Sequence, residues 1–103
     1  MAERILVLRL SSLGDVVLTS TFLRALHDVF PAANVDFVVR EDLAPIATAL
    51  PHVSRVVAVT RGLALPALLD LAAGFARHGY AHVFDLHQSL RSRLLTSRIE
   101  NVV

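Results

Sequence analysis

Residues 4–15 read Arg-Ile-Leu-Val-Leu-Arg-Leu-Ser-Ser-Leu-Gly-Asp, and this stretch decides the fold. Its first seven residues form a nearly continuous apolar run, which is typical of a strand buried on both faces of a parallel sheet. Ser12 and Asp15 then form the Ser-x-x-acid pattern of a capping box, so we predict a helix from Asp15 to Phe30. A strand that turns directly into a helix places backbone N–H groups and the positive end of the helix dipole at the carboxyl edge of the sheet. Open α/β sheets bind ligands at that edge.

The rest of the chain repeats this alternation of strand and helix. Further strands are predicted over residues 35–40, 53–59 and 80–86, and further helices over residues 41–50, 65–78 and 89–98. The predicted fold class is therefore α/β, a Rossmann-like, doubly wound parallel sheet with strand order 3-2-1-4. In this order the loops after the first and fourth strands face each other across a crevice. The helix over residues 15–30 is expected to bury a stripe of Leu18, Phe22, Leu26 and Val29, widened by Leu23 and Phe30. Residues 100–103 have no predicted role.

Composition limits the classes of function. The chain has 103 residues, of which 54% are apolar and only 18% charged, so we expect a single domain with apolar faces meant for absent neighbours. The net charge of +1 and the lack of a basic run give no reason to expect nucleic acid binding. There is no cysteine, Gly-rich nucleotide motif or Asp-x-Asp pair, so neither a cofactor nor a metal is expected. With no signal peptide or spanning segment visible, the predicted location is the cytoplasm.

Asp15 and its neighbours are candidates for chemistry, each with a structural alternative. Asp15 is either a general base or only a capping carboxylate, whose hydrogen-bond donors would keep its pKa low. Ser11 and Ser12 can hydrogen-bond a sugar, although capping explains Ser12 equally well. Gly14 costs the first helical turn up to about 1 kcal/mol relative to alanine, which indicates that something approaches the backbone closely there.

The loop after the fourth strand carries two further candidates. His87 ends that strand and can hydrogen-bond a sugar hydroxyl, assist Asp15, or simply be a structural histidine. Arg91 lies in the first turn of the last predicted helix, where it is either a clamp for a phosphate or carboxylate or a solvated charge beside Arg93.

Three motifs, in this order, resemble the N-terminal part of the lipopolysaccharide heptosyltransferases, glycosyltransferase family 9. The first is Ile5 to Leu10 followed by Ser-Ser-Leu-Gly-Asp-Val-Val-Leu-Thr, and the second is Phe30-Pro31 followed by Val-Asp-Phe-Val-Val-Arg at residues 35–40. The third is Val-Phe-Asp-Leu-His at residues 83–87 followed by Leu-Arg-Ser at residues 90–92. The chain departs from the pattern at Gln88, where many relatives carry a glycine, so the wall of the pocket is expected to differ.

The resemblance implies that residues 1–103 are the acceptor-side Rossmann-like domain of a GT-B glycosyltransferase, incomplete without the C-terminal domain that binds the ADP-sugar. The implied reaction transfers heptose from ADP-heptose to the Kdo–lipid A inner core with inversion, without a metal, in peripheral contact with the inner membrane. Asp15 would be the base, and the acceptor would be bound by Ser11, Ser12, Gly14, Arg61, His87 and Arg91. Arg61 resembles the basic loop that holds the phosphorylated inner core. Two alternatives stay open: a non-catalytic α/β binding or assembly module, and a truncated gene product.

Overall fold

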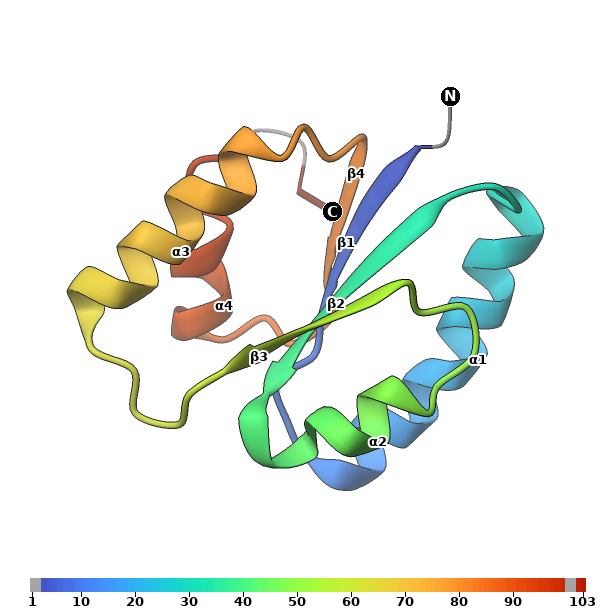
Figure 1. Ribbon diagram of the computed structural model, residues 1–103, viewed down its shortest axis with the longest axis horizontal. Helices are drawn as coiled ribbons and strands as arrows, with labels where there is room; N and C mark the ends of the chain where they lie inside the picture. Colours follow the sequence, from blue (N-terminus) through green and yellow to red (C-terminus); the bar gives the residue numbers. More distant parts are fainter. Residues whose placement is uncertain (1–2, 100–101) are drawn as a thin grey trace.

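The computed structural model describes residues 3–99 and 102–103 and shows alternating strands and helices (Figure 1). The elements are β1 Arg4–Leu8, α1 Leu13–Val29, β2 Asn34–Arg40, the 3-10 helix η1 Glu41–Leu43, α2 Ala44–Thr48, β3 Arg55–Val59, α3 Leu65–Arg77, β4 His82–Asp85 and α4 Leu90–Leu95. The four strands are parallel and lie in the order β3-β2-β1-β4. The predicted α/β class and strand order are confirmed. The helix predicted over residues 41–50 is split, because Pro45 starts α2 as a new helix after η1.

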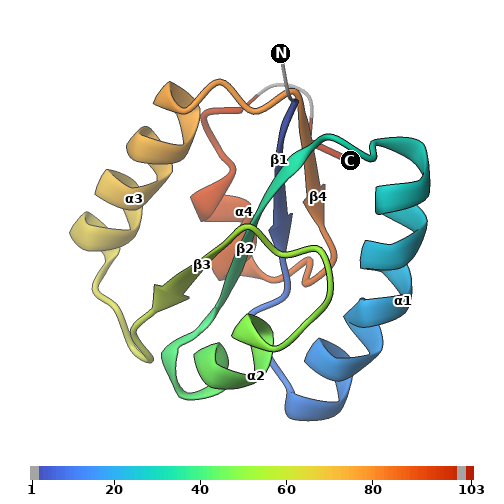
Figure 2. The same cartoon turned by 45° about the vertical axis from the view of Figure 1, so that its right-hand side comes forward.

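The sheet separates two hydrophobic cores. Helices α1 and α2 cover one face and α3 and α4 cover the other (Figure 2). Strand β1 serves both cores, because Ile5 and Val7 pack towards α1 and α2 whereas Leu6 and Leu8 pack towards α3 and α4. A strand with both faces covered needs apolar residues at every position, which explains the continuous apolar run of the sequence.

The buried face of α1 differs from the predicted one. Leu18 and Val29 are 71% and 68% exposed, whereas Val16, Thr19, Leu23 and Leu26 are buried. The helix carries apolar side chains on most of its circumference, so its sequence periodicity fits more than one inward face. The prediction was correct for Leu23 and Leu26, and Phe22 and Phe30 pack, partly buried, against the same core. It was wrong for Leu18 and Val29.

The C-terminal region also corrects the sequence analysis. Helix α4 ends at Leu95, short of the predicted end at residue 98, because the hydroxyls of Thr96 and Ser97 donate to helix carbonyls at 3.2 and 2.7 Å and so compete with the backbone. Val102 then forms a parallel bridge with Val83, and the backbone N–H of Val103 donates to the Val83 carbonyl at 2.8 Å. These last two residues pair alongside β4, although the sequence assigned them no role, while Glu100 and Asn101 lie outside the described residues.

Candidate functional site

The turn between β1 and α1 is organised around the Asp15 carboxylate. The backbone N–H and the hydroxyl of Ser12 donate to Asp15 Oδ2 at 3.4 and 3.0 Å, which confirms the predicted capping box. The same oxygen lies 2.8 Å from Nη2 of Arg9. The other terminal nitrogen of Arg9, Nη1, donates to the Leu86 carbonyl at 2.7 Å. One guanidinium therefore ties the start of α1 to the segment that follows β4.

These contacts set the charge of Asp15. The hydrogen bond from Arg9, followed by those from Ser12, holds the pKa of Asp15 below its usual value. The carboxylate is therefore ionised at neutral pH, and it is a weaker base than a free aspartate. The sequence analysis missed Arg9, although a charged residue inside a buried apolar run was a signal that could have indicated it.

The segment after β4 is held by the buried Asp85. Its Oδ1 accepts hydrogen bonds from the backbone N–H groups of His87 and Gln88 at 3.1 and 2.8 Å, and its Oδ2 accepts from the buried Ser92 hydroxyl at 2.9 Å. Gln88 adopts φ 52°, in the left-handed region where glycine is favoured. The sequence analysis expected a departure from the family pattern at Gln88, and its positive φ makes this position one where glycine would be less strained.

His87 lies on this segment with part of its side chain buried. Burial lowers the pKa of His87, and the positive charge of Arg9 lowers it further. Its Nδ1 and the Nε of Arg9 are buried nitrogens that have no hydrogen-bond partner among the residues the structure describes. Buried polar atoms are normally satisfied by protein groups or by water, so these two nitrogens are exceptions to that rule.

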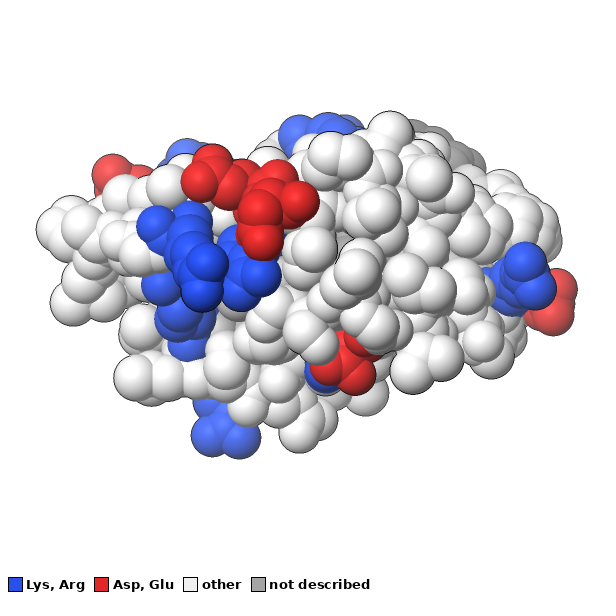
Figure 3. All heavy atoms as spheres, turned by 90° about the horizontal axis from the view of Figure 1, so that it is seen from below, with Lys and Arg blue, Asp and Glu red and all other residues white. Residues whose placement is uncertain are grey.

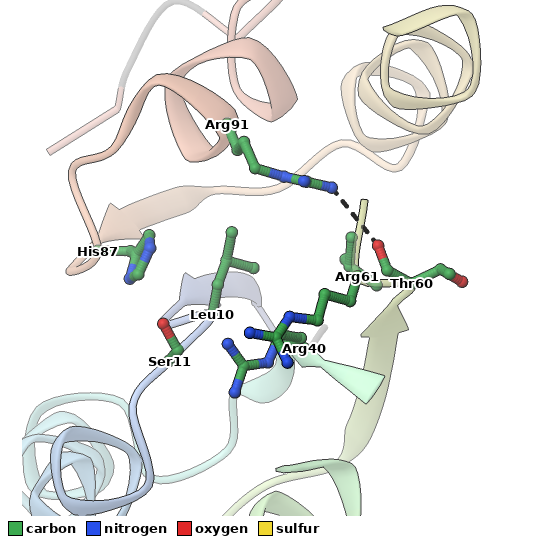
Figure 4. A pocket seen from close by; sticks show the side chains of 8 residues that line it. Leu10, Ser11, Arg40, Thr60, Arg61, His87 and Arg91 are labelled. Carbon is green, nitrogen blue, oxygen red and sulfur yellow. Dashed lines mark hydrogen bonds between the residues drawn. The ribbon is translucent and has the colours of Figure 1, made fainter. Parts of the chain in front are cut away.

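A cavity of about 210 Å³ lies at the carboxyl edge of the sheet (Figure 4). Its lining comes from all four strand ends: Leu10 and Ser11 after β1, Arg40 on β2, Val59, Thr60 and Arg61 at the end of β3, and His87 and Arg91 after β4. The structure thus brings together four of the predicted site residues, namely Ser11, Arg61, His87 and Arg91. Ser12, Gly14 and Asp15 lie beside this cavity at the start of α1 and are not part of its lining. Arg40 was not predicted.

Three arginines make the cavity positive. Arg91 extends from α4 and donates to the Thr60 carbonyl at a long 3.4 Å, and Arg61 has no hydrogen-bond or ion-pair partner within residues 3–99 and 102–103 (Figure 4). Arg40 is held by Asp42, with Nε and Nη2 lying 2.5 and 2.9 Å from the two carboxylate oxygens. Seen from this edge, arginines gather next to acidic side chains (Figure 3). Planar guanidinium groups suit phosphate and carboxylate ligands, so the cavity can hold an anion.

Metal sites and membrane-spanning helices are two further features that would bear on function. Nowhere in the described residues do three or more His, Asp or Glu side chains gather closely enough to hold a metal ion. None of the described helices is both long and apolar enough to cross a membrane.

The comparisons with known proteins come from solved structures. No protein-family model matches the chain, and no curated protein matches it. A glycosyl transferase family 9 protein from Veillonella parvula is 27% identical with a TM-score of 0.84, and the match covers 96% of this chain and 30% of that one. E. coli heptosyltransferase WaaC, solved with ADP, is 26% identical with a TM-score of 0.71 over 97% of this chain and 34% of that one.

E. coli ADP-heptose lipopolysaccharide heptosyltransferase II shows a likeness of fold, with 21% identity and a TM-score of 0.78 over 92% of this chain and 28% of that one. The resemblance to the heptosyltransferases that the sequence motifs indicated is confirmed over nearly the whole chain. The chain spans about a third of the length of these structures.

Proposed function

We propose that this chain is the acceptor-side part of a glycosyltransferase of lipopolysaccharide core synthesis, which transfers heptose from ADP-heptose to the Kdo–lipid A inner core with inversion. The observation that carries the proposal is the arginine-lined cavity at the carboxyl edge of a sheet that matches heptosyltransferase structures. The inner core is acidic, and this cavity offers three arginines to an acidic group. The remaining part of the enzyme, in a GT-B arrangement, would bind the ADP-sugar, since one of the matched structures holds ADP-2-deoxy-2-fluoro heptose.

Asp15 would accept the proton of the attacking hydroxyl. The acceptor oxygen forms a bond to the anomeric carbon of heptose, the bond from that carbon to the diphosphate oxygen breaks, and ADP leaves from the opposite face. Because Arg9 keeps Asp15 ionised, the carboxylate is ready to take a proton at neutral pH. An acceptor hydroxyl becomes far more acidic as its bond to carbon forms, so a weak base placed beside it is sufficient late in the reaction.

The cavity residues would bind and orient the acceptor. Arg61 and Arg91 would grip its phosphate or carboxylate groups, while Ser11 and the unpartnered Nδ1 of His87 would hydrogen-bond its hydroxyls. Ser12 and Gly14 would contribute the backbone of the first turn of α1, where a Cβ added at Gly14 would meet only open space. The leaving diphosphate would be neutralised by protein groups in place of a metal. The enzyme would work in the cytoplasm, touching the inner membrane that carries its lipid acceptor.

The test is an amide NMR titration of the 103-residue chain with heptose-free inner-core oligosaccharide and, separately, with ADP-heptose. The expected result is a set of shifts around residues 11–15 and 87–91 with the oligosaccharide and almost none with ADP-heptose. A chain that binds no carbohydrate and forms a stable dimer would contradict the proposal and favour an assembly module. The role of Asp15 is tested by Asp15→Asn in a complete enzyme, where unchanged turnover would exclude it as the base.

A further inference from the structure

Asp42 places a negative charge beside a cavity whose arginines attract anions. Its carboxylate binds one edge of the Arg40 guanidinium, through Nε and Nη2, and Arg40 lines the cavity. The hydrogen bond from Arg40 lowers the pKa of Asp42, and the positive charge of Arg61 lowers it as well. One carboxylate therefore lies within the field of two of the three cavity arginines.

The placement of this carboxylate follows from local structure. Arg40 is the last residue of β2, and Asp42 follows two residues later in the first turn of η1, so the pair forms without any distant element. The Asp42 side chain is half exposed, whereas the guanidinium that it holds faces the cavity (Figure 4). Asp42 itself does not line the cavity, and none of the eight lining residues is acidic.

We propose that Asp42 is a specificity-determining counter-ion that competes with a phosphate-bearing ligand for Arg40 and Arg61. This inference rests on the proposed function, in which the cavity receives an anionic group of the acceptor. A phosphate entering the cavity must either displace Asp42 from Arg40 or bind with only part of the positive charge available. The counter-ion keeps the affinity for phosphate alone low, so that free phosphate and nucleotides of the cell do not fill the cavity. Contacts with the sugar then decide which phosphate-bearing molecule stays bound. The cavity gains specificity because Asp42 weakens the binding of ligands that offer only a phosphate.

This competition predicts that removing the charge of Asp42 increases the affinity of the cavity for phosphate. Asp42→Asn keeps the shape of the side chain and removes its charge. Exposed ion pairs are weak, so inorganic phosphate should bind roughly 2- to 5-fold more tightly to this variant than to the unaltered chain. Because the repulsion scales with ligand charge, the gain should be larger for methyl phosphate, a dianion above its second pKa, than for dimethyl phosphate, a monoanion.

Glu41→Gln is the matched control. Glu41 is the preceding residue and is exposed, and its side chain forms no hydrogen bond or ion pair among residues 3–99 and 102–103. Its replacement changes the net charge by the same amount as Asp42→Asn without releasing Arg40. Because the Glu41 carboxylate holds none of the cavity arginines, phosphate affinity should change less than in Asp42→Asn. Arg61→Gln should weaken phosphate binding, whereas Arg93→Gln, an exposed arginine outside the cavity lining, should not.

The measurement is the dissociation constant from amide shifts of the 103-residue chain titrated with inorganic phosphate in phosphate-free buffer. Tighter binding by Asp42→Asn than by Glu41→Gln supports the proposal, and equal binding by the two variants overturns it. Asp42→Ser is a second variant with the same expectation if the asparagine variant fails to fold.

The outcome for the proposed function is read from a separate titration with heptose-free inner-core oligosaccharide, with and without its phosphates. If Asp42→Asn tightens phosphate binding but neither oligosaccharide binds, the counter-ion role stands and the proposed function fails. If the oligosaccharide binds but Asp42→Asn behaves as Glu41→Gln does, the proposed function stands and the counter-ion role fails. Preference for the phosphorylated form would identify the acceptor, not free phosphate, as the source of the ligand's phosphate.

Discussion

Replacing Gln88 with glycine should stabilise the chain. Among the described non-glycine residues, only Gln88 and His52 have a positive φ, at 52° and 63°. The left-handed conformation costs a residue with a side chain about 1–2 kcal/mol, and glycine removes that cost. The backbone N–H of residue 88 donates to Asp85 at 2.8 Å, and glycine keeps this N–H, so the hydrogen bond that holds the segment survives the substitution.

The expected gain is smaller than the strain because glycine also frees the unfolded chain. That extra freedom costs about 0.4–1 kcal/mol, which leaves a net stabilisation of roughly 0.5–1 kcal/mol. For a domain of this size, such a gain corresponds to an increase in Tm of about 2–8 °C.

Urea unfolding followed by far-UV circular dichroism measures this gain. Gln88→Ala is the control, because it removes the side chain and keeps the strained backbone, so it should give no gain. Gly79→Ala is the converse test: Gly79 has φ 70°, and a side chain there should destabilise the fold by about 1 kcal/mol or more. A glycine variant no more stable than the alanine variant would refute the assignment of strain to residue 88.

Three further predictions concern polar contacts. Arg9→Gln removes the largest cause of the lowered Asp15 pKa, so the carboxyl should titrate closer to 3.8 in an NMR pH titration. A lowered carboxyl pKa stabilises the fold above the unfolded-state pKa and loses that effect as pH falls through the folded-state pKa. The stability difference from the unaltered chain should therefore shrink in acid to the part that comes from the lost hydrogen bond to Leu86. Ser92→Ala leaves the buried Asp85 carboxylate short of a partner and should destabilise the chain by about 1–3 kcal/mol in urea unfolding. Burial raises the pKa of Tyr80, and its hydrogen bond at 2.6 Å to the Asp36 carboxylate on β2 raises it further. Absorbance of this single tyrosine should therefore show ionisation only well above pH 10 in the folded chain. Because the folded state then holds the proton more tightly than the unfolded state, stability should decline as pH rises past about 10.

The sequence predicted the sheet and half of the residues that line the cavity because those features follow from local patterns. Four apolar runs separated by helical segments leave few topologies once crossovers are right-handed, and the order 3-2-1-4 is the simplest of them. That order brings the ends of β1 and β4 together, so the sequence alone groups Ser11, His87 and Arg91 at one edge of the sheet. The capping box of Ser12 and Asp15 spans only four residues, which is why its geometry was predictable.

Features that depend on tertiary contacts were not predictable. The hydrogen bond of Arg9 to the Leu86 carbonyl joins residues 77 apart in the sequence, and the local sequence does not specify that partner. Arg40 reads as the ordinary end of a strand, and only the fold shows that it lines a cavity. The inward face of α1 was predicted only in part, because a helix with apolar residues on most sides takes its orientation from the sheet beneath it.

The guanidinium of Arg9 also has a mechanical consequence. It holds the first turn of α1 with one nitrogen and the segment after β4 with the other, at 2.8 and 2.7 Å. This side chain therefore links the two sides of the crevice, and we expect a ligand that displaces His87 to shift Asp15 as well. Binding in the cavity and the orientation of the Asp15 carboxylate would then be coupled.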